Sequence, residues 1–212
     1  MSTFADATSA FLALALLALP AVARAEKPNP CPPLTSFAEP RIIPVDVAPN
    51  EVGLTFVGHA TFLIETARGV RIATDYNDYV RPSVVPDIVT MNKAHSTHYS
   101  DHPDPGIKLI LRGWNPSGGP IYYDETFKDV RIRNVQTNIR NWDGGTEYDG
   151  NSIFVFESAG LCIAHLGHLH HERTPDHLAQ LGRIDEVLVP IDGSYTLDIQ
   201  AMMNVLNQSA RG

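Results

Sequence analysis

The sequence predicts an α+β protein in which short strands outnumber helices. From Val52 onward, runs of four to seven residues rich in Val, Ile, Phe and Thr recur between turn residues, a pattern typical of strands. Only two segments near the C-terminus have the apolar spacing of helices. No repeat and no linker divides residues 51–212, so we expect these residues to form one domain.

The residues before this domain are expected to serve export rather than folding. Residues 1–25 contain the apolar stretch AFLALALLALPAVARA, whose small-x-small ending is typical of a signal-peptide cleavage site. The stretch is short for a membrane span. We therefore expect cleavage, a periplasmic or secreted product, and no stable membrane span afterwards. Residues 26–50 are rich in proline, and we expect a lead that wraps the surface or stays mobile.

Nine strands are expected between Val52 and the first predicted helix. The runs that predict them are, in chain order, GLTFVG, TFLIET and VRIATD, then DIVTM, KLILR and PIYYD, then VRIRNV, SIFVFES and GLCIAHL. Turn signals such as NPSGGP, DGG and SAG separate these runs.

Two helices are expected near the C-terminus, with a strand between them. Thr174 suits an N-cap, Pro175 suits the first helical position, and Gly182 suits the end of the helix TPDHLAQLG. The segment DEVLVPI then predicts a buried strand, and TLDIQAMMNVLNQ has helical spacing.

The charge balance restricts the class of partner. The chain carries a net charge of −8, whereas a protein that binds nucleic acid presents a basic face. We therefore expect no nucleic-acid partner. The sequence does not decide the oligomeric state.

The chain has two cysteines, Cys31 and Cys162. In an exported protein they could pair. We expect them to stay unpaired, because Cys162 falls in a predicted buried strand and Cys31 in a proline-rich segment.

The nine histidines of the chain are its most informative feature. Most of them follow predicted strands, in three groups: His59, then His95, His98 and His102, then His165, His168, His170 and His171. Side chains at strand ends share a crevice, and three imidazoles with one open position describe a catalytic zinc centre. A helical turn would bring His95 and His98 to one face. We expect His165 and His177 to have no part in such a site.

Three segments also match a known family in their order and spacing. They are TFVGHATFLIETARGVRIATD, PDIVTMNKAHSTH, and GLCIAHLGHLHHERTPDHLAQLGRIDEVLVPIDGSYTLD. They resemble the metallo-β-lactamase superfamily, in the branch of zinc-dependent hydrolases that includes L-ascorbate-6-phosphate lactonase-like proteins. The resemblance spans roughly Val52 to the C-terminus and implies an αββα sandwich. Because the chain ends before the last family ligand, we expect the sandwich to lack its last strand and helix.

The resemblance implies a ligand set for zinc. In the family motif His-x-His-x-Asp-His, the second and last histidines fall on His95 and His98, while Lys93 and Thr97 replace the first histidine and the aspartate. The bridging aspartate of a later Gly-Asp turn falls on His168. Protonated lysine cannot bind zinc. The implied site is therefore His95, His98 and His168 around an ion with one open position.

Further residues are implied as substitutes or supports. His102 and His170 are substitute ligands from the same turns, and Asp101 could replace the missing carboxylate. Residues expected to orient ligands or contact substrate are His59, Asp75 and His171.

The implied activity is hydrolysis of a small-molecule ester, lactone or phosphoester by water that zinc activates. Lys93 would then stabilise a developing oxyanion. Two alternatives stay open: an exported, non-catalytic metal-binding protein, and an incomplete copy of the fold. One or two ions are possible, and imidazole also accepts iron, nickel or copper. The sequence leaves the substrate undecided, as well as whether Lys93 and Thr97 abolish activity.

Overall fold

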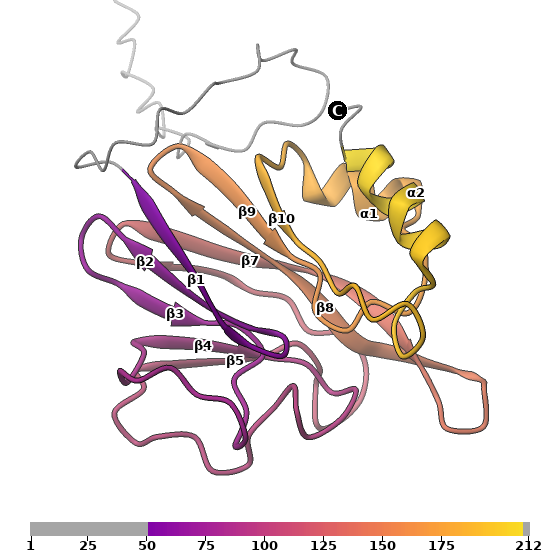
Figure 1. Ribbon diagram of the computed structural model, residues 1–212, viewed down its shortest axis with the longest axis horizontal. Coiled ribbons are helices and arrows are strands. Elements are labelled where there is room, and N and C mark those ends of the chain that lie inside the picture. Colours follow the sequence, from indigo (N-terminus) through magenta and orange to yellow (C-terminus); the bar gives the residue numbers. More distant parts are fainter. Residues whose placement is uncertain (1–50, 210–212) are drawn as a thin grey trace, which may run out of the picture.

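The computed structural model describes residues 51–209, which form two five-stranded sheets and two helices (Figure 1). The first sheet contains, in spatial order, β1 (Val52–Gly58), β2 (Thr61–Thr66), β3 (Arg71–Ala73), β4 (Ile88–Met91) and β5 (Leu109–Arg112). The second contains β10 (Glu186–Leu188), β9 (Leu161–His165), β8 (Thr146–Ser158), β7 (Val130–Arg140) and β6 (Asp124–Phe127). The helices are α1 (Pro175–Leu181) and α2 (Ile199–Ser209). These elements confirm the predicted class, a sandwich of two mixed sheets with few helices.

The two sheets bury a shared apolar core. Ile64, Ile72 and Ile88 of the first sheet belong to the same buried cluster as Phe154 and Phe156 of the second. Alternate residues of a strand point to the same face, so β8 places Phe154 and Phe156 together on the inner face. Burial of such side chains stabilises the sandwich by about 1.5–3 kcal/mol each.

The outer faces are covered in different ways. On the second sheet, Leu181 of α1 and Met202 and Val205 of α2 pack against strand residues such as Val155. Figure 1 shows both helices on this side. On the first sheet, loop residues take this role in the described part of the chain, where Tyr99 and Trp114 pack against Met91 of β4.

The ends of α1 follow the expected chemistry. The Thr174 hydroxyl accepts a hydrogen bond from the His177 amide, and the Thr174 amide donates one to the His177 ring, both at 3.2 Å. Gly182 follows the last turn with φ 63°, a conformation that favours glycine. His177 therefore lies on the predicted helix, where it takes part in the cap.

Two predicted strands differ from the structure. In the segment PIYYD, strand pairing begins only at Asp124. Before that residue, the amides of Ile121 and Tyr123 donate to the side chains of Gln136 and Asn134 and not to backbone carbonyls of a neighbouring strand. The strand β10 is not buried as predicted. It is an edge strand that pairs only with β9, so its residues stay partly exposed.

Several predictions concern residues outside the described range. The signal peptide at residues 1–25 and the lead at residues 26–50 lie there and stay predictions. Among the described helices, none has the length and apolar character that crossing a bilayer requires. The expectation of unpaired cysteines is wrong for Cys162, which is fully buried in β9 and disulfide-bonded. Cys31, the other cysteine, lies outside the described residues.

Candidate metal centre

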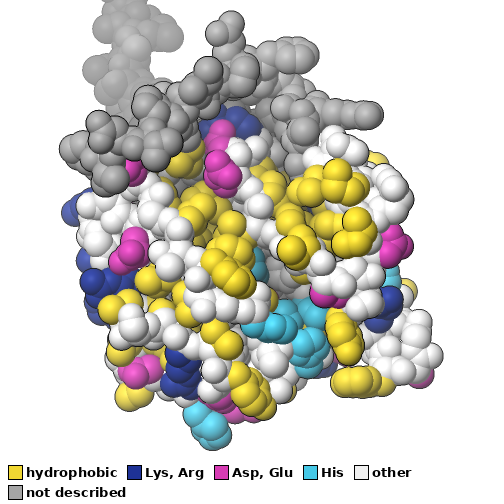
Figure 2. All heavy atoms as spheres, viewed as in Figure 1, with side chains coloured by type: hydrophobic (Ala, Val, Ile, Leu, Met, Phe, Trp, Pro, Cys, Tyr) yellow, Lys and Arg dark blue, Asp and Glu magenta, His cyan; other side chains and the backbone are white. Residues whose placement is uncertain are grey.

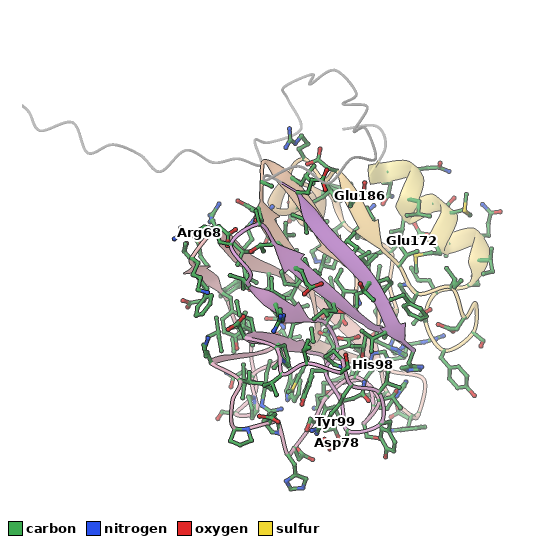
Figure 3. All side chains as sticks on the ribbon, turned by 60° about the vertical axis from the view of Figure 1, so that its left-hand side comes forward. Arg68, Asp78, His98, Tyr99, Glu172 and Glu186 are labelled. Atoms are coloured by element: carbon green, nitrogen blue, oxygen red, sulfur yellow. The ribbon has the colours of Figure 1, made fainter. Side chains whose placement is uncertain are left out.

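Histidines from both sheets meet at one end of the sandwich. His59 lies in the turn between β1 and β2, His95 and His98 lie in the loop after β4, and His168 follows β9. In Figure 3, His98 lies at the end of the molecule that also carries Asp78 and Tyr99, away from Arg68 and Glu186. The topology thus brings together side chains from three separate segments.

The imidazole rings are close enough to share an ion. The Nε2 atom of His98 lies 2.9 Å from Nδ1 of His168. The ring of His95 lies 4.6 Å from that of His98 and 4.7 Å from that of His168, centroid to centroid. One nitrogen each of His59, His95 and His98 also lie within 4.8 Å of one another. Two nitrogens on one tetrahedral zinc ion are about 3.4 Å apart, so this donor set fits a metal ion.

The His95–His98 segment forms a tight turn, not the helical turn considered from the sequence. The His98 amide donates to the His95 carbonyl at 2.9 Å. The Thr97 hydroxyl lies 2.6 Å from Nδ1 of His95, which leaves Nε2 of His95 for an ion. Thr97 therefore orients the ring of His95 from the position where the family motif has aspartate.

A buried carboxylate lies behind the cluster. Asp75 has no exposed surface, and its Oδ2 lies 2.6 Å from Nδ1 of His98 while its Oδ1 accepts from Asn92 Nδ2 at 2.9 Å. Burial alone would raise the pKa of Asp75, but His98, His165 and Asn92 lower it below its usual value. An ionised Asp75 fixes the proton of His98 on Nδ1 and leaves Nε2, the atom that faces His168, with a lone pair available to an ion.

His168 depends on a glycine beside it. Gly167 has φ 61°, and a Cβ atom there would lie 2.3 Å from Asn92 Nδ2 and 2.6 Å from Asn151 Oδ1. The same Asn151 oxygen accepts from the His168 amide at 2.9 Å. Only glycine allows this approach, which places the His168 ring against His98.

The environment keeps these imidazoles neutral. Burial is the largest influence on each ring and lowers the pKa of His59 and His95, and that of His168 to about 3. The neighbouring His98 adds to the effect in all three. Neutral imidazole is the form that binds metal ions, so the cluster is ready to bind at neutral pH.

Two substitute residues from the first loop do not join the cluster. Asp101 and His102 are exposed, and neither lines a cavity beside the histidines. The His102 amide instead donates to Ser100 Oγ at 3.0 Å. The structure therefore gives neither side chain a contact with the proposed ligands.

The residues around the second loop lie nearer. The His170 ring is 4.6 Å from that of His168, but its Nδ1 accepts from the Arg140 amide at 2.6 Å. Burial lowers the pKa of His170 to about 4. His171 is half-buried beside it. Lys93, which we expected to assist catalysis, forms an ion pair with Glu147.

A cavity of about 510 Å³ opens over the cluster. Its lining residues are Phe56, His59, Ala60, Phe62, His95, Thr97, His98, His165, Gly167, His168, Val189, Pro190, Ile191, Asp192, Tyr195 and Thr196. His165 thus reaches the cavity, although we expected no role for it; its Nδ1 has no hydrogen-bond partner among the described residues. Figure 2 shows histidine side chains on this face with hydrophobic side chains next to them.

Another cavity, of about 860 Å³, adjoins the cluster and shares His95, His168 and Tyr195 with the first. Lys93 and Arg140 line it.

Sequence reasoning did not identify Tyr195 or the loop that carries it. The run DGSYT is a signal for an Asx turn that could have pointed to this loop.

Comparisons with known proteins agree with this geometry. Residues 53–209 match the family model described as a β-lactamase superfamily domain. A metal-dependent hydrolase of Thermoplasma volcanium is 23% identical over 180 residues, which cover 74% of this chain and 78% of the relative.

Two solved structures are also similar. One is a proposed zinc-dependent hydrolase of the metallo-β-lactamase superfamily from Thermotoga maritima, with a TM-score of 0.53 and 28% identity, covering 76% of this chain and 71% of that one. The other, a proposed metal-dependent hydrolase from Parabacteroides distasonis, has a TM-score of 0.57 and 14% identity, covers 75% and 78%, and supports the fold alone. Since the family model covers most of the chain and the fold agrees, the protein belongs to the metallo-β-lactamase superfamily.

Proposed function

We propose that this protein is a metal-dependent hydrolase whose ion, expected to be zinc, is held by His95, His98 and His168. The observation that carries the proposal is the convergence of these rings, with Nε2 of His98 only 2.9 Å from Nδ1 of His168 and Asp75 behind His98. The similar proteins from Thermoplasma volcanium and Thermotoga maritima, both described as hydrolases that depend on a metal, support the reaction class.

Different residues of the chain would have different roles in hydrolysis. When bound, zinc in a site of three histidines supplies a Lewis acid and lowers the pKa of a water molecule toward ~7. Asp75 orients His98, and Thr97 orients His95. His59 has a ring nitrogen within 4.8 Å of nitrogens of His95 and His98, so it is placed either to act as a further ligand or to accept a proton from the attacking water.

A non-catalytic role in metal binding is the second candidate. It is favoured by Lys93 and Thr97, which stand where the family motif has a ligand histidine and an aspartate. A site with these residues holds fewer donors for a second ion. Export to the periplasm would suit either role and also stays a proposal.

Metal analysis and turnover together test the proposal. Purified protein is expected to bind one zinc ion, and to hydrolyse p-nitrophenyl acetate in a reaction that a chelator stops and added zinc restores. The variants His95→Ala and His168→Ala should lose both the ion and the activity. His102→Ala, an exposed histidine of the same loop, is the control and should keep both.

The two candidates predict different results for the same protein. Full zinc occupancy without turnover on esters, lactones or phosphodiesters would support the non-catalytic role. Failure to bind any divalent ion would end both.

A further inference from the structure

We propose that the substrate carries an apolar acyl chain in ester or lactone linkage, and that this chain lies in the 510 Å³ cavity over the histidines. This inference rests on the proposed hydrolase function and names its substrate class. The cavity is called the acyl cavity below, and its walls are Phe56, Phe62, Val189, Pro190 and Ile191.

The walls of the acyl cavity are apolar and come from both sheets. Phe56 of β1 and Phe62 of β2 lie with their ring centroids 5.1 Å apart on one side. Val189, Pro190 and Ile191 follow β10 on the other side. The histidines form the polar end between them. A substrate that reaches the histidines with its scissile carbonyl would therefore lay its neighbouring atoms against hydrocarbon.

The charges around the acyl cavity disfavour an anionic substrate. None of the described residues that line it is Lys or Arg. Its one carboxylate, Asp192, already accepts hydrogen bonds from the amides of Ser194, Tyr195 and Thr196 and from the Thr196 hydroxyl. Sites for phosphate normally present Arg, Lys or free backbone amides. Among the described residues that line the cavity there is no Arg or Lys, so a carbonyl ester fits it better than a phosphoester.

The basic residues of the adjoining cavity are engaged as well. Lys93 pairs with Glu147. The Arg140 guanidinium donates to the carbonyls of Ser194, Tyr195 and Thr196 at 2.8–3.0 Å. Both cations have partners within the protein and lie outside the acyl cavity, so a phosphate in that cavity would have to draw one of them away from its partner.

The rim of the acyl cavity leaves apolar surface in contact with water. Phe56 is 61% exposed, Ile191 78% and Tyr195 74%. A volume of 510 Å³ lies in the range of small-molecule sites. Each methylene that moves from water onto such surface strengthens binding by about 0.8 kcal/mol, or about fourfold. An acyl chain of several carbons therefore gains more from this site than a short polar ester.

A chain-length series tests the inference on the zinc-loaded protein. The substrates are p-nitrophenyl acetate, butyrate, hexanoate and octanoate, with bis-p-nitrophenyl phosphate as the anionic comparison. We expect kcat/KM to rise by about tenfold or more from acetate to hexanoate, as burial of two or more methylenes requires, and the phosphodiester to be the poorest substrate. Equal rates along the series, or preference for the phosphodiester, would overturn the inference.

Two variants test where the acyl chain of the substrate lies. Ile191→Ser removes apolar surface from an exposed loop position of the acyl cavity, and we expect the hexanoate-to-acetate ratio of kcat/KM to fall severalfold. Val85→Ser is the matched control, because Val85 is also half-exposed and apolar but lines neither cavity. If the hexanoate-to-acetate ratio is unchanged in Ile191→Ser, or falls equally in Val85→Ser, the acyl chain does not bind against Ile191.

A binding measurement separates this inference from the proposed function. Acetate, hexanoate and octanoate are titrated calorimetrically into the zinc-loaded protein, since the product carboxylates need no turnover to bind. Tighter binding of the longer acids without hydrolysis of any ester would support the acyl cavity and contradict the hydrolase. Hydrolysis without any dependence on chain length in rate or binding would support the hydrolase and contradict the acyl cavity.

Discussion

His98 Nδ1 lies 2.6 Å from Oδ2 of Asp75, a carboxylate that has no contact with solvent. The other oxygen of Asp75 accepts from Asn92, whose own side-chain oxygen accepts from the Ser152 amide of β8. One chain of hydrogen bonds therefore runs from a candidate ligand on the first sheet to the backbone of the second. The orientation of His98 depends on both sheets.

Removing the charge of Asp75 is expected to weaken metal binding without removing a ligand. Asp75→Asn keeps the size of the side chain but loses the ionised partner that holds the ring of His98 through Nδ1. Metal affinity should fall about 10–100-fold, measured by competition with a chromophoric chelator. Asp87→Asn is the control, since Asp87 pairs with Lys108 outside the cluster. Equal affinity in both variants would mean that Asp75 has only a structural role.

Lys93 is expected to affect turnover and not the ion. Lys93→Ala should lower kcat/KM about tenfold if the ammonium assists a developing oxyanion, while zinc content measured by atomic absorption stays unchanged. Lys108→Ala removes a comparable surface ion pair and should change neither. A loss of zinc in Lys93→Ala would count against this role for the ammonium.

Gly167→Ala is expected to destabilise the fold by about 2 kcal/mol or more, because the new methyl group collides with Asn92 and Asn151 in addition to straining φ. Gly118→Ala is matched to it: Gly118 has φ 87° but open space around the missing side chain. It should cost only the backbone strain, about 1 kcal/mol. Urea unfolding of both variants separates the two effects, and similar losses in the two would show that the collision is relieved.

Asp192 is expected to make stability depend on acid pH. Burial alone would raise the pKa of Asp192, but hydrogen bonds from Thr196, Ser194 and Tyr195 lower it below the usual 3.8. The stabilisation is therefore fully present above pH 3.8 and is lost as the pH falls through the folded-state pKa.

The test compares Asp192→Asn with the unmodified protein by urea unfolding at several pH values. The variant should be less stable by about 1 kcal/mol at pH 7, and the difference should shrink as the pH falls below 3.8. Asp143→Asn is the control, because within residues 51–209 Asp143 accepts from a single amide, that of Gly145. A difference that is constant with pH would exclude the charge of Asp192 as its cause.

Local signals predicted the elements whose causes are local. The helix α1 begins after Thr174 and ends before Gly182, as predicted, because a few adjacent residues determine where a helix is capped. The segment before β6 and the edge strand β10 were misjudged because their states depend on partners elsewhere, such as Asn134 for the Tyr123 amide. An apolar run does not reveal whether it lies at the edge or the centre of a sheet.

The candidate site was foreseen only in part. His95 and His98 are adjacent in one loop, whereas His168 is 70 residues from His98, and the resemblance to a family supplied that pairing. Asn92 and Asn151 could not be foreseen, because buried amides that bridge two sheets have no sequence pattern of their own. The apolar walls around Phe56 and Ile191 arise from segments that only the tertiary fold brings together.

The candidate ligands come from both halves of the sandwich, since His95 and His98 follow β4 and His168 follows β9. An ion shared by them would act as a cross-link between the halves, much as a disulfide joins distant parts of a chain. Loss of the ion would then weaken the contact between the two sheets. The sheets would separate at the histidine end before the rest of the protein unfolds.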